Sequence, residues 1–286
     1  MAQASTDVSS AAPVREEIVI RPPGPYSGLH LTELWRFRGM LARKVKQRIR
    51  VQYDDMLLGF FWAVARPVIM VLVFLGFRKL ADANVGVSIP YPLYLYSGLV
   101  VWFFFTEATV GVAMSLQRDA GLIQKIYFPR LLSPLSYLLA EAYNLAMASY
   151  PLAILIAAFG EPPDWKVLLL PLVVAQLLLL SLGVGLVFSA LVLIKRDWER
   201  VLKFSLYVGL WVSPVIYSFE RVPEKLKLFY LVNPMSGTLL AIRATLFGSF
   251  AFPWSAWLYA LIFSLLLAKL GLYLFQMAER TVADKL

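Results

Sequence analysis

Long runs of apolar residues alternate with short polar segments along most of this chain. A helix that crosses a bilayer needs about 20 mostly apolar residues. Six runs have about that length, and each is bounded by charge, Pro or Gly: 57–80, 91–116, 131–159, 167–194, 202–219 and 252–277. Because helices satisfy their own backbone hydrogen bonds in lipid, the pattern predicts an all-α membrane protein with six transmembrane helices.

The chain before the first run divides into two parts. Residues 1–30 are polar, contain Pro22, Pro23 and Pro25, and have no apolar core. We therefore expect a flexible cytosolic tail and not a cleaved signal peptide.

Residues 31–56 show a different pattern, with apolar residues at three- and four-residue spacing among many basic ones. This predicts an amphipathic interface helix in the inner membrane surface, its apolar side in lipid and its bases toward the headgroups. The helix is either an anchor only, or its polar face also touches a cytosolic partner. Its candidate contact residues are Trp35, Arg36, Arg43 and Lys46.

A polar connector, 115–130, joins the second and third runs. It combines helical spacing, charges of both signs and an aromatic-proline ending. A connector that only links two spans needs none of these, so we expect a surface that is contacted from the cytosol. The candidate residues of this contact surface, called coupling residues below, are Gln117, Arg118, Asp119, Gln124, Lys125, Tyr127, Phe128, Pro129 and Arg130.

Residues 220–251, before the last run, are too polar and too interrupted to form a span. Asn233-Pro234 is a typical helix start, with a capping side chain followed by Pro at the first position. Two short helices are expected, as a re-entrant periplasmic helical hairpin or, alternatively, as a hairpin on the outer surface. The hairpin would form an outer gate, for which Pro223, Asn233 and Pro234 are the candidate residues.

Two carboxylates, Glu107 and Glu141, lie inside apolar runs. Ionisable groups within a membrane are costly and face a cavity or a partner. Two interpretations stand: a protonated or hydrogen-bonded carboxyl inside the bundle, or a role in a transport path.

The charge distribution indicates the orientation of the chain. The net charge is +9 and 60% of the residues are hydrophobic. With six spans and both termini in the cytosol, the inner side receives 19 Lys and Arg residues and the outer side seven. This asymmetry follows the positive-inside rule. The basic excess is thus a sign of topology and of contact with anionic membrane lipids, not of nucleic-acid binding.

Several kinds of chemistry are missing from the sequence. The chain has no Cys and one His, which excludes disulfides, Cys-rich zinc sites and thiol catalysis. No phosphate-binding Gly-x-x-x-x-Gly-Lys-Ser/Thr motif and no hydrolase motif occurs. We expect no metal, no cofactor and no catalytic residue in this chain. Active transport would take its energy from another subunit or an ion gradient.

Five motifs in order resemble the type-2 ABC exporter permeases for polysaccharides and polyol phosphates. The resemblance covers about residues 31–280. The motifs are Leu58-Gly59 with Trp62 and Pro67; Tyr94-Leu95-Tyr96-Ser97-Gly98-Leu99 with Trp102; Lys125-Ile126-Tyr127-Phe128-Pro129-Arg130; Ser213-Pro214-Val215-Ile216-Tyr217; and Val222-Pro223 with Asn233-Pro234.

The resemblance implies a permease domain at 57–286, in a homodimer that binds two copies of a cytosolic ATPase in the cytoplasmic membrane. ATP and Mg²⁺ would belong to the partner ATPase. The substrate would be a lipid-linked glycan on undecaprenyl diphosphate, of the O-antigen type. A sliding sugar polymer suits a path of aromatic faces, for which the candidates are Trp62, Phe74, Phe204, Tyr207, Trp211 and Tyr217.

Other functions remain open from the sequence. Within the family, a teichoic acid exporter is a close alternative and a capsule exporter a more distant one. An ATP-independent flippase for lipid-linked sugars would show an inverted repeat with paired broken helices. A membrane enzyme acting on such lipids would show clustered acids or His at one membrane face. Neither pattern is found.

Overall fold

The computed structural model describes the backbone of residues 31–54, 59–80 and 86–283 and the side chains of 34–53, 64–80 and 86–278. Within these ranges every regular element is helical. The expected tail 1–30 and the side chain of Trp62 lie outside the described residues.

Four described helices are long and apolar enough to cross a bilayer. They are α4 (Tyr91–Ala113), α7 (Leu132–Phe159), α8 (Leu170–Ile194), preceded by the 3-10 turn η1 (Trp165–Leu169), and α12 (Trp254–Ala283). They correspond to the second, third, fourth and sixth expected spans. The all-helical membrane fold is therefore confirmed, while the count of six stays a prediction.

The two other expected spans differ from these four. Helix α3 (Gly59–Leu80) has 22 residues, and α9 (Asp197–Val212) has 16. The predicted bounds 202–219 are wrong for α9, because the helix begins five residues earlier and ends at Val212. The backbone leaves the helix at Ser213.

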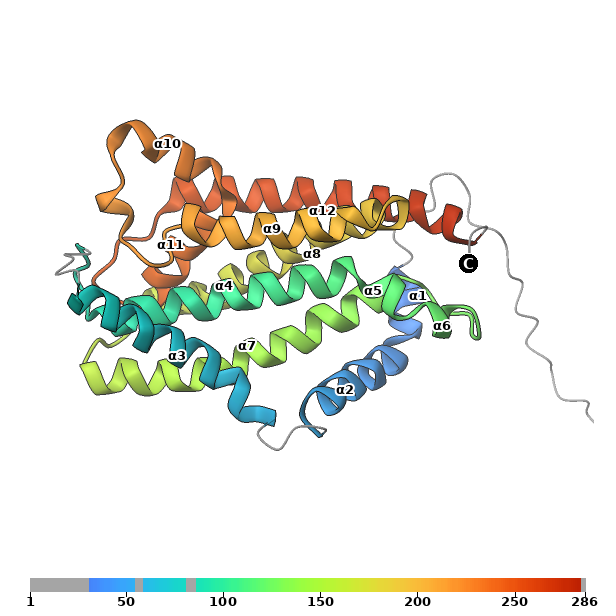
Figure 1. Cartoon of the computed structure of the whole chain (residues 1–286), viewed down its shortest axis with the longest axis horizontal. Helices are drawn as coiled ribbons and strands as arrows, with labels where there is room; N and C mark the ends of the chain where they lie inside the picture. Colours follow the sequence, from blue (N-terminus) through green and yellow to red (C-terminus); the bar gives the residue numbers. More distant parts are fainter. Residues whose placement is uncertain (1–30, 55–58, 81–85, 284–286) are drawn as a thin grey trace, which may run out of the picture.

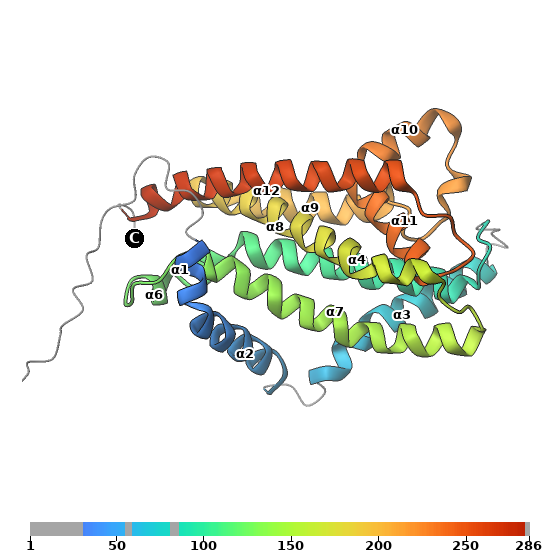
Figure 2. The ribbon, with the colours of Figure 1, turned by 180° about the vertical axis from the view of Figure 1, so that it is seen from behind.

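Helix α4 forms the centre of the bundle. It packs against α7, α8, α3, α9 and α11 (Pro234–Leu246), and most of its side chains are buried. Figures 1 and 2 show α4, α7, α8, α9 and α12 running along the same long axis. The aromatic and apolar residues that made run 91–116 look like a span thus form the core of the protein.

The bundle has two distinct ends. At one end, the connector end, lie α1 (Leu31–Arg36), the single-turn helices α5 (Ser115–Arg118) and α6 (Ala120–Ile123), and the last turns of α12 (Figure 1). At the other, the hairpin end, lie α10 (Glu224–Val232) and α11. Helix α1 and the last turns of α12 are therefore at the same end of the bundle.

Helix α2 (Arg38–Asp54) lies obliquely beside α7 (Figure 1). It turns part of its basic face inward: Lys44 is buried and Arg48 half-buried. Leu41, Val45 and Ile49 instead line a shallow depression with Leu139 of α7. The expectation that all bases of this helix point to headgroups is wrong for Lys44 and Arg48, because the bundle offers them polar partners.

The hairpin end contains the expected pair of short helices. Asn233 caps α11: its side-chain oxygen accepts a hydrogen bond from the Met235 backbone N–H at 3.0 Å, and Pro234 is the first helical residue. This confirms the helix start read from Asn233-Pro234. Most of α11 is buried, whereas α10 contains no buried residue. How far the pair dips into a membrane stays a prediction.

Candidate functional site

The connector is held to the bundle through Asp119, which lies between α5 and α6. The Oδ2 atom of Asp119 is 2.7 Å from Lys44 Nζ and 2.7 Å from Arg48 Nη2, both on α2. Ser133, at the start of α7, also donates its hydroxyl to Asp119. Helix α2, the connector and the start of α7 thus meet on one carboxylate.

The charge state of Asp119 follows from these contacts. Burial by itself raises the pKa of the carboxyl. The hydrogen bonds from Lys44 and Ser133 and the charges of Arg48 and Lys44 outweigh that effect, so the pKa lies below its ordinary value. Asp119 is therefore an anion at neutral pH and keeps both cations of α2 in place.

Two aromatic rings complete the contact between α2 and the connector. Lys44 Nζ lies 4.7 Å from the centroid of the Phe128 ring, and the Arg48 guanidinium lies 3.3 Å from that of Tyr137. Arg48 also donates its Nε–H to Ser136 Oγ at 2.8 Å. Such cation–π contacts add to the ion pairs and leave α2 fixed against α7 and the connector.

Neighbouring aromatic residues of the connector differ in exposure. Tyr127 is 65% exposed and Phe128 only 3%. The prediction that both offer surface to a partner is therefore corrected for Phe128, which Lys44 covers. Asp119 is likewise turned inward.

The other candidate coupling residues are placed as follows. Gln117, Arg118, Gln124 and Lys125 are exposed, and Pro129 and Arg130 half-buried. Together with the exposed apolar side chains of Leu122 and Ile126, they make the connector end a mixed polar and apolar surface.

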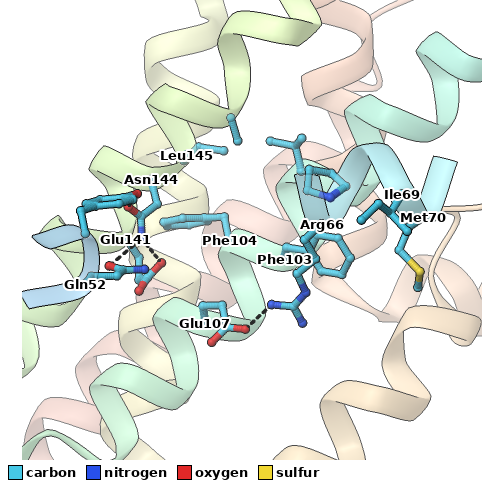
Figure 3. Close-up of a pocket in the computed structure, with 14 residues that line it drawn as sticks. Gln52, Arg66, Ile69, Met70, Phe103, Phe104, Glu107, Glu141, Asn144 and Leu145 are labelled. Atoms are coloured by element: carbon cyan, nitrogen blue, oxygen red, sulfur yellow. Dashed lines mark hydrogen bonds and ion pairs between the residues drawn. The ribbon is translucent and has the colours of Figure 1, made fainter. Parts of the chain in front are cut away.

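A second cluster brings together the two intramembrane acids. Figure 3 shows Arg66 of α3 pointing at Glu107 of α4, with 2.6 Å between Arg66 Nη1 and Glu107 Oε1. Glu141 of α7 accepts a hydrogen bond from Asn144 Nδ2 at 2.9 Å. All four line one cavity of about 570 Å³, and a role of the two acids in a transport path stays a prediction.

The candidate path residues lie largely on one face of α9. Phe204, Tyr207 and Trp211 are exposed. Trp211 also meets Phe74 of α3 edge to face, with 6.3 Å between ring centroids. Tyr217 lies beyond the helix and donates its hydroxyl to the Trp211 carbonyl at 2.8 Å. Phe204, Tyr207 and Trp211 thus form an exposed aromatic face on α9.

Sequence reasoning missed the residue that organises the hairpin end, Arg243. This α11 side chain is only 2% exposed. It donates to the carbonyls of Pro214 at 2.5 Å, Val215 at 2.8 Å and Tyr94 at 3.2 Å. Its guanidinium also lies 3.5 Å from the centroid of the Tyr94 ring. A lone Arg in an otherwise uncharged helix was the signal that could have indicated this role.

The segment that follows α9 is held from several sides. Tyr94 and Tyr91 of α4 donate their hydroxyls to the carbonyls of Tyr217 at 2.8 Å and Ile216 at 3.2 Å. Asn233 donates its amide to Ser213 Oγ at 2.9 Å. Among the candidate gate residues, Asn233 therefore connects this segment to α11, Pro234 is the first residue of α11, and the exposed Pro223 precedes α10.

The candidate residues of the interface helix point outward. Trp35, Arg36, Arg43 and Lys46 are all exposed, and the Arg38 guanidinium stacks on Trp35 at 4.7 Å. Lys44, Arg48 and Tyr53 of α2, in contrast, make contacts with the bundle.

Comparison with known proteins adds a family. A family model described as ABC-2 type transporter matches residues 40–247. The O-antigen export system permease protein RfbA of Klebsiella pneumoniae is 27% identical over 200 residues, 68% of this chain and 75% of the relative. RfbA of Myxococcus xanthus is 26% identical over 74% of this chain and 82% of its own. The polysialic acid transport protein KpsM of Escherichia coli is 24% identical over 82% and 92%.

Proposed function

The chain belongs to the ABC-2 type transporter family, and from that premise we propose that it is the membrane permease subunit of an exporter of lipid-linked polysaccharide. The exporter is a homodimer of this chain with two copies of a cytosolic ATPase. ATP and Mg²⁺ bind to the ATPase, and this chain contributes no catalytic residue. Its six spans cross the cytoplasmic membrane with both termini in the cytosol.

The observation that carries the proposal is the set of contacts that α2, the connector and α7 make through Asp119. We call this set of contacts the clasp. A partner that pushes on the exposed part of the connector moves a rigid unit, because the ion pairs join α2 to it. The connector continues directly into α4 on one side and α7 on the other. Tyr127, whose side chain is exposed, is the connector residue that receives that push.

The polymer path runs along the exposed aromatic face of α9. Phe204, Tyr207 and Trp211 present ring faces that stack on sugars without a strong binding site at any point. A second copy of the chain closes this face into a channel. At the hairpin end, the segment held by Arg243 and Asn233 together with α10 and α11 forms the outer gate, which dips into the outer leaflet.

The substrate class comes from the relatives. The two O-antigen permeases are 27% and 26% identical to this chain, and the polysialic acid transport protein is 24% identical over a longer stretch. We propose an O-antigen-type polysaccharide carried on undecaprenyl diphosphate. Capsular polysaccharide is the second candidate, since the capsule relatives align along more of the chain.

Co-purification tests the proposal directly. The full chain, expressed from its native locus, is expected to retain an ATPase subunit, and vesicles containing the complex should move lipid-linked glycan only with ATP. A chain that purifies alone and moves glycan on an ion gradient would be an ATP-independent flippase. Tyr127→Ala is expected to reduce retention of the ATPase, while Tyr150→Ala, an equally exposed Tyr on α7, leaves it unchanged.

A further inference from the structure

The cavity in Figure 3 has a polar end and an apolar end. Its polar end is formed by Gln52, Tyr53, Arg66, Glu107, Glu141 and Asn144, and the rest is lined by apolar side chains such as Ile69, Met70, Phe104 and Leu145. Its volume, about 570 Å³, lies within the range of ligand sites. A cavity with this division suits an amphiphile and not a wholly polar solute.

The polar end of the cavity lies on the side of the connector end. Glu107 is six residues from the end of α4 at Ala113, which corresponds to about 9 Å along the axis. That end of α4 continues into the connector, and α2 contributes Gln52 and Tyr53 at the same level. A lipid of the leaflet on the connector side would therefore enter head-first toward Glu107, with its chains along the apolar part.

The charged side chains of the cavity indicate which kind of lipid headgroup it binds. Its lining contains one cationic side chain, Arg66, and two acidic ones, Glu107 and Glu141, besides the Tyr53 phenol. Arg66 uses Nη1 for Glu107 and is half exposed, so other N–H groups of its guanidinium stay available for a phosphate. The two carboxylates can accept hydrogen bonds from a cationic group, so they favour a head that carries a cation close to its phosphate.

The hydrogen bonds around Glu141 indicate which cationic group the headgroup carries. Among the residues that the structure describes, Glu141 accepts one bond, from Asn144, and a carboxylate accepts about four. Asn144 is itself held by Tyr53 at 2.5 Å and Gln52 at 3.2 Å, so Glu141 has a fixed neighbour and spare acceptor capacity. A primary ammonium with three N–H donors uses that capacity, whereas a quaternary ammonium has none to donate.

The adjoining cavity contributes further charged side chains close to the two acids. It shares Gln52, Glu107 and Glu141 and adds Lys44, Arg48, Arg118 and Asp119. Lys44 and Arg48 are both bonded to Asp119, and Arg118 lies over the Tyr137 ring. Arg66 is therefore the cation placed among the headgroup contacts of the first cavity.

We propose that the cavity between α2, α3, α4 and α7 binds a phosphatidylethanolamine-type lipid, with the phosphate on Arg66 and the ammonium on Glu107 and Glu141. The site goes beyond the proposed transport function and does not depend on it. A bound lipid there joins α3, which packs mainly on α4 and α7, to the clasp that α2 makes with the connector.

The test measures thermal stability of the full chain in nanodiscs of phosphatidylcholine with one added lipid. Phosphatidylethanolamine is expected to raise the melting temperature, because a ligand that binds only the folded state stabilises it. Phosphatidylglycerol and N,N-dimethyl-phosphatidylethanolamine are expected to raise it less. Equal stabilisation by all three lipids, or by none, would overturn the proposal.

Variants and mass spectrometry locate the site. Glu141→Gln and Arg66→Gln should abolish the selective stabilisation and the retention of phosphatidylethanolamine after detergent extraction. Glu224→Gln and Arg200→Gln, whose side chains are exposed on α10 and α9, should keep both. If the wild-type chain retains a lipid-linked glycan in place of phosphatidylethanolamine, the cavity is a substrate site and the lipid assignment is wrong.

Discussion

The Nζ atom of Lys44 lies 2.7 Å from the Oδ2 atom of Asp119, although 75 residues separate them in the chain. Both side chains are largely withdrawn from solvent. The pair joins the helix that precedes the first span to the connector between two later ones. A connector held in this way would pass a movement of a cytosolic partner on to α4 and α7, because it moves as a rigid unit with α2.

Replacing Asp119 with Asn should detach α2 from the connector. The substitution leaves Lys44 and Arg48 without their anion. Since a hydrogen bond to a charged group contributes about 1.5–3 kcal/mol, a clear fall in melting temperature is expected. ATP-driven glycan transport by the complex should fall more than ATP hydrolysis does. Asp197→Asn, in an exposed i,i+3 pair with Arg200, is the matched control and should leave both properties unchanged.

The contribution of Asp119 should depend on pH in a defined direction. Its pKa in the folded chain lies below the ordinary value of 3.8, so its stabilising effect is complete above that value and is lost as pH falls through the lower, folded pKa. The difference in melting temperature between wild type and Asp119→Asn should therefore be constant between about pH 8 and pH 5 and shrink below about pH 4. A difference that shrinks near neutral pH would contradict a lowered pKa.

Tyr127 and Phe128 should respond differently to truncation. Phe128→Ala removes a buried ring under Lys44, and buried Phe→Ala changes cost about 3–5 kcal/mol. Tyr127→Ala removes an exposed ring, and we expect a change within about 0.5 kcal/mol. Thermal melting of the chain alone separates the two. The outcome that sinks this assignment is a strongly destabilised Tyr127→Ala chain beside an unaffected Phe128→Ala chain.

Gly98 should be intolerant of even one methyl group. A Cβ atom there would lie 2.4 Å from Arg243 Nη2 and 2.9 Å from the Val215 carbonyl oxygen. Neither neighbour can retreat easily, since Arg243 is bonded to three carbonyls. Gly98→Ala is expected to destabilise by about 1–3 kcal/mol, as overpacking does.

Gly76 provides the matched control on α3, where an added Cβ meets nothing within 4 Å. Gly76→Ala should be neutral or stabilise by up to about 1 kcal/mol, because Ala loses less conformational freedom in a helix. Melting temperatures in one detergent check both changes. Equal effects of the two substitutions would mean that Arg243 does not hold the segment after α9 as rigidly as its hydrogen bonds indicate.

The positions of helices were predictable from the sequence wherever one local property of the chain determines them. The spans at α4, α7, α8 and α12 follow from runs of apolar residues, and the start of α11 follows from Asn233-Pro234. The bounds of α9 do not follow from its apolar run, which continues to Phe219. The helix ends at Val212 because Ser213 precedes Pro214, and a residue before proline is disfavoured in helical backbone. Arg243 and Tyr94 then take up carbonyls of the segment that follows.

Sequence by itself therefore determined the class of fold, the family and the connector as a polar surface between two spans, since hydrophobicity, capping and motif order are properties of neighbouring residues. Only the tertiary structure decided that Phe128 is buried while Tyr127 is exposed, that Asp119 faces inward, and that Arg243 holds the hairpin end. These outcomes depend on partners tens of residues away in the chain, and side chains with similar local patterns differ only in what packs over them.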